Sequence, residues 1–320
     1  MNGVRISGLG SAKPENLVSN TDLSKFVDTS DEWITTRTGI KSRYISSGET
    51  AVELAVDAAK VAISDANVNP SEIDLIIVAT ISPDQMMPST ACCVQSIIGA
   101  KNATAFDISA ACSGFVFASK IAVDAIRIGS AKKALVIGAE ILSKSIDWTD
   151  RNTCVLFGDG AGAVIYEKSD VNKIINIYTG SDGTLGQVLT LDHTPINNCL
   201  VTTDLSTSYL KMDGREVYKF ATSVVPLCIN KVLEGTDYSL SSIKKFILHQ
   251  ANERILNSVA KKLGIDDKLL FKNLFEYGNT SAASIPIALD DAKSSLCKGD
   301  IIILAGFGGG LTWGSILFEW

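Results

Sequence analysis

The chain has little of what marks a membrane, nucleic-acid-binding or disulfide-rich protein. Only 20% of its 320 residues are charged and the net charge is −6, which argues against disorder and against a general nucleic-acid role. No apolar run reaches the roughly 18 residues of a membrane span, and the N-terminus lacks the pattern of a signal peptide. The seven cysteines show no CxxC spacing, so we expect neither disulfides nor a zinc site. A protein of the reducing cytoplasm is predicted.

Apolar residues, by contrast, are abundant. They make up 46% of the chain, enough for a large core in one wide domain or two fused ones. Short β-branched runs alternate with helical patterns along the whole length, which favours a layered α/β fold.

The chain also contains an internal duplication. Four segments recur in the same order: residues 71–78 match 241–248, 106–112 match 275–281, 135–138 match 303–306, and 162–167 match 314–319. The separation is about 170 positions for the first three pairs and about 152 for the last, so the first half carries about 16 additional residues before Gly162. We predict two similar halves, residues 1–171 and 172–320, whose sheets share central helices. A pseudo-dyad would then bring equivalent strand ends together.

Cys112 is the first candidate for chemistry. It follows a strand-like segment and precedes an apolar helical pattern that begins at Phe115. A helix N-terminus favours the thiolate, so we expect a lowered pKa and a nucleophilic sulfur. Packing is the ordinary role of a buried cysteine, but the small neighbours here leave space for a substrate.

Two further residues could join Cys112. His249, one of only two histidines, ends the apolar segment 246–248, and the ends of strands are where open α/β folds place catalytic groups. A structural histidine is the alternative. Asn279 follows Gly278 before a helical pattern, which is typical of a turn or N-cap residue. Only its position in the duplication suggests a catalytic role.

Two other motifs are less specific. Residues 307–310 read Phe-Gly-Gly-Gly after an apolar strand, and such a turn either connects strands or offers N–H groups to an oxyanion. Arg254, Lys261 and Lys262 share one face of a helix predicted over residues 252–263. That face is either solvated or a docking site for an acidic partner.

These motifs resemble a known family, the β-ketoacyl-acyl-carrier-protein synthases III of bacterial fatty-acid synthesis. The resemblance covers essentially the whole chain and rests on residues 31–34, 37–40, 110–115, 158–163, 249–252, 278–284 and 307–314. It implies the thiolase fold, in which duplicated βαβαβ halves form five αβαβα layers. It also implies a homodimer that uses no cofactor or metal.

The implied reaction is a decarboxylative condensation. An acyl-CoA primer, expected to be acetyl-CoA, would react with malonyl-acyl carrier protein to give 3-oxoacyl-acyl carrier protein, CoA and CO2. By resemblance, Cys112 takes the acyl group and the N–H groups of Cys112 and Gly309 form the oxyanion hole. His249 and Asn279 would hydrogen-bond the malonyl thioester oxygen.

The resemblance also assigns binding residues. Trp33 and Arg151 would hold the CoA adenine between them, and Arg151 falls in the insertion of the first half. The CoA channel would be lined by Thr29, Arg37, Gly214 and Asn252, with Phe307 near its base. Met87 would reach the acyl pocket of the neighbouring subunit. The carrier protein would meet Lys219, Gln250, Ala251, Asn252, Glu253, Arg254, Lys261 and Lys262.

Other interpretations fit less well. Elongating synthases use a second histidine, but His193 lies in no family motif, and degradative thiolases need a second cysteine that residues 307–310 lack. Two alternatives stay open. One is a related condensing enzyme with a different primer, and the other is a non-catalytic subunit that binds carrier protein, although such subunits typically lack the nucleophile.

Overall fold

Two β-sheets form the framework of the computed structural model, which describes residues 2–193, 196–201 and 208–320. The first sheet has the order β1-β7-β6-β4-β5 and the second the order β11-β12-β13-β8. Their strands are β1 (Gly3–Ala12), β4 (Leu75–Ala79), β5 (Thr104–Ile108), β6 (Lys133–Glu140) and β7 (Gly160–Ser169), then β8 (Ile174–Ser181), β11 (Lys245–Leu248), β12 (Ile301–Gly308) and β13 (Thr312–Glu319). The proposed division at residues 171 and 172 falls between β7 and β8.

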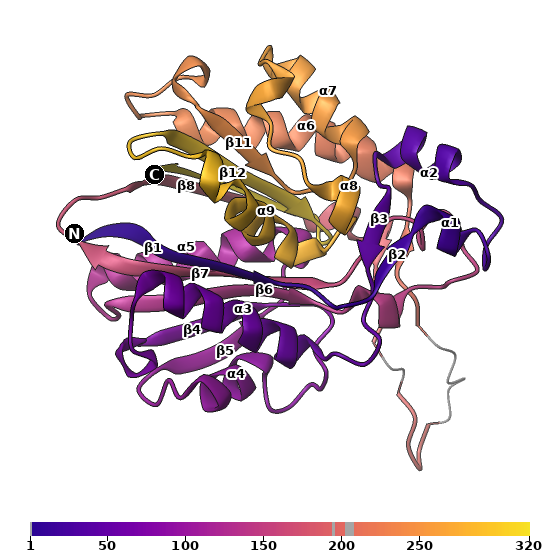
Figure 1. Ribbon diagram of the computed structural model, residues 1–320, viewed down its shortest axis with the longest axis horizontal. Coiled ribbons are helices and arrows are strands. Elements are labelled where there is room, and N and C mark those ends of the chain that lie inside the picture. The colour runs from indigo at the N-terminus through magenta and orange to yellow at the C-terminus, as the bar shows by residue number, and fades with distance from the viewer. Residues whose placement is uncertain (1, 194–195, 202–207) are drawn as a thin grey trace.

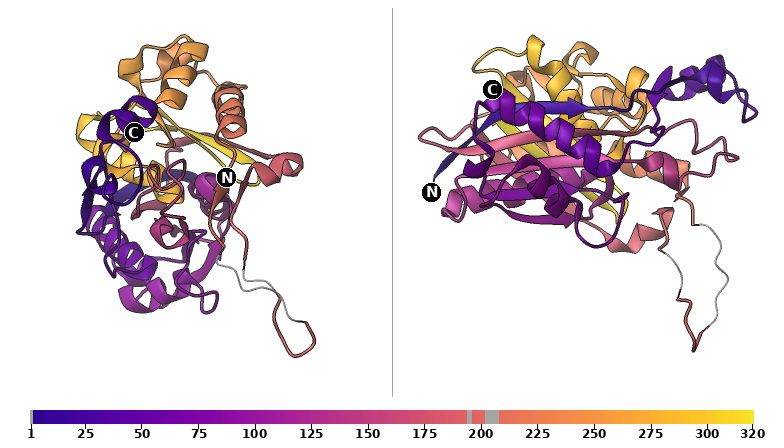
Figure 2. Two further views of the ribbon diagram at one scale, coloured as in Figure 1. Left: turned by 90° about the vertical axis from the view of Figure 1, so that its right-hand side faces the viewer. Right: turned by 60° about the horizontal axis from the view of Figure 1, so that its bottom comes forward.

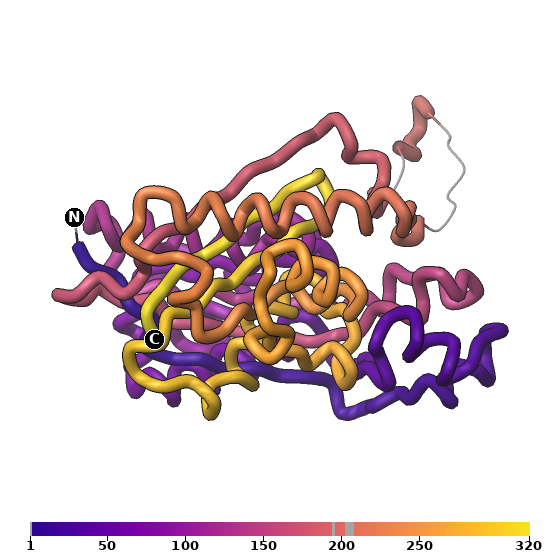
Figure 3. The backbone as a smooth tube through the Cα atoms, turned by 90° about the horizontal axis from the view of Figure 1, so that it is seen from above, coloured from indigo at the N-terminus to yellow at the C-terminus, as the bar shows by residue number. Residues whose placement is uncertain are grey.

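Helices complete five layers (Figure 1). The outer face of the first sheet is covered by α3 (Ala51–Ala66) and α4 (Thr90–Ile98), and the outer face of the second by α6 (Gly214–Leu233) and α7 (Glu253–Leu263). Between the sheets lie α5 (Gly114–Ile128) and α9 (Ser284–Ala292). Figure 3 shows α6 and α7 lying over the second sheet. The predicted αβαβα arrangement is confirmed.

The central helices are apolar because they touch both sheets. In α5, Phe115, Val116 and Ala122 are fully buried in the core that the two sheets share. The charged residues of α5 lie on the side left partly open to solvent, where Lys120 and Asp124 form an ion pair. Likewise, α7 buries Ile255, Leu256 and Val259 on one side and exposes its charged residues on the other.

The duplication is visible in the strands. Both β4 and β11 follow a short 3-10 turn and pair in parallel with β6 and β12, respectively. One of the predicted matches is wrong, because residues 275–276 do not form a strand like β5 but lie in the short helix α8 (Leu274–Tyr277). In place of a fifth strand, Leu270 makes an isolated parallel bridge to Phe246.

The two turns before the central helices are true equivalents. They span Ala111–Ser113 and Ser281–Ala283, and their first residues both have a positive φ, 46° and 49°. Cys112 therefore corresponds to Ala282, one position away from the match predicted from the sequence.

Close backbone contacts join each turn to the opposite half. A Cβ atom on Gly138 of β6 would lie 2.2 Å from the carbonyl oxygen of Ala282. Likewise, a Cβ on Gly308 of β12 would lie 2.6 Å from the backbone nitrogen of Cys112. Only glycine permits this approach, so both glycines fix where the halves meet.

Three insertions stand at one end of the layers (Figures 1 and 2). Residues 141–159 connect β6 to β7, where only 309–311 connect β12 to β13, which confirms the predicted insertion. Residues 13–50 hold β2 (Leu17–Ser19), α1 (Asn20–Leu23), α2 (Asp31–Thr38) and β3 (Ser42–Tyr44), and the third insertion holds β9 (Leu189–Thr190) and β10 (Lys211–Met212). Across the described ranges, no helix combines the length and apolarity needed to cross a membrane.

Candidate active site

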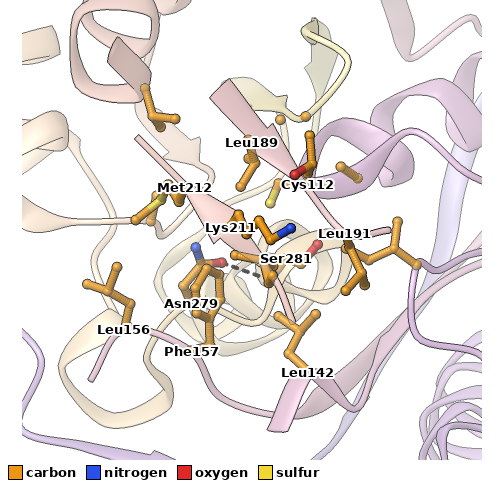
Figure 4. A pocket seen from close by; sticks show the side chains of 18 of the residues that line it. Cys112, Leu142, Leu156, Phe157, Leu189, Leu191, Lys211, Met212, Asn279 and Ser281 are labelled. Atoms are coloured by element: carbon orange, nitrogen blue, oxygen red, sulfur yellow. Dashed lines mark hydrogen bonds between the residues drawn. The ribbon is translucent and has the colours of Figure 1, made fainter. Parts of the chain in front are cut away.

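A cavity of about 1510 Å³ opens where the two halves meet the three insertions. Cys112, His249 and Asn279 all line it, so the structure brings the three predicted residues together. Figure 4 shows Cys112, Asn279 and Ser281 around the cavity, with apolar walls from Leu142, Phe157 and Leu189. No cluster of metal-ligating side chains occurs among the residues that the structure places.

Cys112 lies in the turn directly before α5 and is 8% exposed. Burial raises the pKa of its thiol to about 12, while a hydrogen bond with the Ser281 side chain opposes the rise. This direction is the opposite of the lowered pKa predicted from the sequence, because desolvation of the buried thiolate is the largest influence on the group. The resting sulfur is a thiol.

His249 follows the last residue of β11, as predicted, and is 1% exposed. Its Nδ1 lies 3.0 Å from the Ser284 hydroxyl, and its ring meets the Phe307 ring edge to face at 5.2 Å between centroids. Burial lowers the pKa of the imidazole to about 3. The ring is therefore neutral at physiological pH, with one N–H to donate.

The backbone N–H and carbonyl groups of Asn279 are both hydrogen-bonded. Its N–H donates to Leu156 O at 2.8 Å and its carbonyl accepts from Gly158 N at 3.0 Å. The side-chain oxygen accepts the Ser281 N–H at 2.9 Å, the bond drawn in Figure 4. The amide NH2 is then the donor that Asn279 can offer to a molecule in the cavity.

The glycine turn lies beside the sulfur. Phe307, Gly308, Gly309 and Gly310 all line the cavity, and the contact of Gly308 with the Cys112 backbone places this turn next to the nucleophile. The arrangement can present the N–H groups of Cys112 and Gly309 to one oxygen, which stays our prediction for the oxyanion hole.

Most of the predicted CoA residues surround the cavity mouth. Trp33, Arg37, Gly214 and Asn252 line it, whereas Thr29 and Arg151 do not. The guanidinium carbon of Arg37 lies 4.4 Å from the Trp33 ring centroid, and that of Arg151 lies 5.2 Å from it. An adenine between Trp33 and Arg151 needs about 7 Å, twice a van der Waals contact. Arg151 must therefore move if it is to cover a purine.

The predicted carrier-protein face divides into surface and core. Arg254, Lys261, Lys262 and Lys219 are exposed, whereas Gln250 is only 1% exposed. Its amide donates to Leu248 O and Phe271 O and accepts from Asn273 N. The prediction that Gln250 contacts the carrier protein is therefore wrong. Its buried side chain stabilises the end of β11 and is not accessible to a partner. Ala251, Asn252 and Glu253 are half-buried.

Several site residues escaped sequence reasoning. Leu189, Leu191 and Met212, around the β9–β10 ladder, form one wall of the cavity, and their insertion has no counterpart in the duplication. Glu140 is fully buried and accepts hydrogen bonds from Ser82, Thr80 and Ser281 as well as from a backbone N–H. Burial raises the pKa of this carboxyl. A glutamate that ends an apolar strand is the signal that could have revealed it.

Met87 is 86% exposed and lies outside the cavity of its own chain, whereas its neighbour Met86 lines that cavity. The predicted reach of Met87 into a second subunit is compatible with this position, and it stays a prediction.

A cavity that gathers a buried thiol, a neutral imidazole and a carboxamide between two duplicated α/β halves defines a condensing enzyme of the thiolase fold. Comparisons with known proteins place it further. The family model described as 3-oxoacyl-[acyl-carrier-protein (ACP)] synthase III matches residues 106–183, and its C-terminal counterpart matches residues 233–320.

Relatives match along the whole chain. The β-ketoacyl-[acyl-carrier-protein] synthase III of Clostridium acetobutylicum is 52% identical, with 100% of this chain and 99% of the relative covered. The crystal structure of 3-oxoacyl-[acyl-carrier-protein] synthase III from Aquifex aeolicus is 48% identical with a TM-score of 0.93, covering 99% of this chain and 100% of that one. The priming β-ketosynthase of the R1128 polyketide pathway is 34% identical with a TM-score of 0.94, covering 99% and 96%. The chain belongs to the β-ketoacyl-[acyl-carrier-protein] synthase III family.

Proposed function

We propose that this enzyme starts fatty-acid synthesis by condensing an acyl-CoA primer, acetyl-CoA in the first instance, with malonyl-acyl carrier protein. The products are 3-oxoacyl-acyl carrier protein, CoA and CO2. The observation that supports this most strongly is the meeting of Cys112, His249 and Asn279 in one cavity, in a chain of this family.

In the first half-reaction, the Cys112 sulfur attacks the thioester carbonyl of acyl-CoA. A new carbon–sulfur bond forms, the bond to CoA breaks, and the thiol proton leaves with the CoA sulfur. The negative charge that develops on the carbonyl oxygen is stabilised by the N–H groups of Cys112 and Gly309. The aromatic and cationic mouth around Trp33 and Arg37 suits the CoA nucleotide.

In the second half-reaction, the malonyl group loses CO2 and leaves an enolate. Its oxygen would accept hydrogen bonds from His249 and from the Asn279 amide. Negative charge develops on this oxygen only as CO2 leaves. The two donors therefore stabilise the transition state more than the uncharged thioester. The enolate carbon then attacks the acyl carbonyl, and the Cys112 sulfur leaves as a thiolate that takes up a proton from water.

The proposal includes a homodimer. β5 is an edge strand of the first sheet, and the large apolar side chains of Met86, Met87 and Ile97 are exposed in the segments beside it. Edge strands that stay uncovered invite pairing with another chain. A second copy paired there would bring Met87 to the acyl end of the partner's cavity. We expect this dimer to work in the cytoplasm.

Trapping the acyl-enzyme tests the proposal. After incubation with acetyl-CoA, intact mass spectrometry of the wild type should show one acetyl group, which peptide mapping assigns to Cys112. Cys112→Ser should show none, because a hydroxyl is a far weaker nucleophile. Cys228→Ser is a matched control, since Cys228 is also buried but does not line the cavity. An acyl group on another cysteine would contradict the proposal.

A further inference from the structure

Ser284 stands behind the imidazole of His249. It is the first residue of α9 and is 2% exposed. Its hydroxyl oxygen lies 3.0 Å from His249 Nδ1 and accepts the backbone N–H of Gln250 at 2.7 Å. One side chain of the C-terminal half thus contacts two consecutive residues at the end of β11.

The hydrogen-bonding capacity of this hydroxyl determines where its proton goes. A serine hydroxyl has one proton to donate and two lone pairs, and the Gln250 N–H occupies one lone pair. Among the described residues, Nδ1 of His249 is the remaining hydrogen-bond partner of the Ser284 oxygen. If Nδ1 also carried a proton, the buried hydroxyl proton would have no acceptor, and an unsatisfied buried donor is costly. The hydroxyl therefore donates to Nδ1.

We propose that Ser284 is a positioning residue that holds His249 as the tautomer protonated on Nε2, with Nε2–H directed to the malonyl thioester oxygen. This inference rests on the proposed function, in which His249 donates to the enolate. Neutrality of the ring, which its burial also favours, is required for the arrangement, because a protonated Nδ1 could not accept from the hydroxyl.

The duplication shows that this pair is a feature of one half alone. Since the turns at Ala111 and Ser281 are equivalent, His249 corresponds to Ala79 and Ser284 to Gly114. Those counterparts also adjoin, because a Cβ on Gly114 would lie 3.0 Å from the Ala79 side chain. The fold therefore brings the two positions together in both halves. Only the C-terminal half places a histidine and a hydroxyl there.

Kinetics of the two half-reactions test the role. Ser284→Ala should slow CO2 release from malonyl-carrier protein about tenfold, the value of one hydrogen bond at the upper end of its range. The change should fall on kcat with KM unchanged, and acylation by acetyl-CoA should stay at the wild-type rate. Ser284→Thr, which keeps the hydroxyl, should recover the lost rate. Ser119→Ala is the matched control, since Ser119 is a buried, hydrogen-bonded serine on α5.

The tautomer is measured directly by 15N NMR of histidine-labelled wild-type protein, with His249 identified by its absence from the spectrum of His249→Ala. We expect a proton on Nε2 and an unprotonated Nδ1 that accepts a hydrogen bond. A proton on Nδ1 would overturn the proposal. The proposal would also be overturned if Ser284→Ala released CO2 at the wild-type rate while His249→Ala released it more slowly. Wild-type decarboxylation by both variants would instead overturn the enolate role of His249 itself.

Discussion

Two buried cysteines with the same acidity differ in what surrounds them. Burial raises the pKa of Cys112 and of Cys228 to about 12. Cys228 donates to Val225 O inside α6, whereas Cys112 faces a cavity and a turn of glycines. We therefore propose that the position of Cys112, and not a lowered pKa, makes it the nucleophile of the resting enzyme.

The raised pKa predicts how the sulfur responds to pH. Well below a pKa of about 12, the thiolate fraction rises tenfold per pH unit. Alkylation of Cys112 by iodoacetamide, followed by mass spectrometry, should therefore accelerate steadily from about pH 7 to pH 10. The unfolded protein, with an ordinary thiol, should level off near its pKa of about 8.5. A plateau below pH 8 in the folded enzyme would mean that the thiolate is stabilised after all.

At the scale of the element, α7 carries the charge that we assign to docking. Arg254 donates to Thr36 O, and Lys262 donates to Thr222 O. Lys261 is exposed and makes no side-chain hydrogen bond or ion pair within the described ranges. Lys261 can thus be reversed in charge without breaking a contact of the fold, which separates docking from structure.

We expect Arg254→Glu and Lys261→Glu each to raise the KM for malonyl-carrier protein, on the order of tenfold for a charge reversal at a complementary interface. Self-acylation by acetyl-CoA should change little in Lys261→Glu. Added salt should weaken wild-type docking in the same way. Lys168→Glu is the control. It makes the same change of charge near the C-terminal end of β7, away from α7, and should leave this KM unchanged. Equal loss in both half-reactions of Lys261→Glu would argue against a docking face.

The sequence predicts the helices and strands that have a strong apolar pattern. It does not predict segments whose conformation depends on contacts with distant parts of the chain. The strand that ends before His249, the helix after Asn252 and the insertion around Arg151 were all foreseen, because apolar runs and the duplication mark them. Residues 275–276 were not, because their partners come from the first insertion. Glu276 pairs with Lys13 and Tyr44, and the Phe275 carbonyl accepts from Lys41.

The sequence predicts which residues make up the site. It does not predict their burial, their pKa values or their hydrogen-bond partners. Cys112, His249 and Asn279 stand in motifs that sequence alone reveals. The pKa of Cys112 depends on its burial against β12 and the turn Ser281–Ala283 of the other half, which no local pattern encodes. Ser284 lies within a predicted motif, yet its contact with His249 spans 35 positions of sequence and became visible only in the fold.

At the scale of the whole molecule, the proposed dimer would complete the acyl pocket. Methionine is flexible and adapts to gaps, whereas a phenyl ring is a stiffer wall. Met87→Phe should therefore narrow the enzyme toward the shortest acyl-CoA primers, as measured by acylation rates across a panel of chain lengths. Met86→Phe, which alters the cavity of the same chain, gives the comparison. An unchanged profile in Met87→Phe would show that no partner pocket receives this residue.

We propose that the two halves of the molecule divide the chemistry between them. In this proposal the N-terminal half supplies Cys112 for acyl transfer, and the C-terminal half supplies His249 and Asn279 for decarboxylation. Losing one donor to a developing oxyanion typically costs on the order of 3 kcal/mol, or about a hundredfold in rate. Acyl transfer does not use these donors, so it should survive their loss.

The most direct test measures both half-reactions in His249→Ala and Asn279→Ala. Acetyl-enzyme formation is followed by mass spectrometry, and CO2 release from labelled malonyl-carrier protein is counted separately. Each variant should accept the acetyl group near the wild-type rate and release CO2 about a hundredfold more slowly. Wild-type decarboxylation in either variant, or loss of acylation as severe as in Cys112→Ser, would contradict the account.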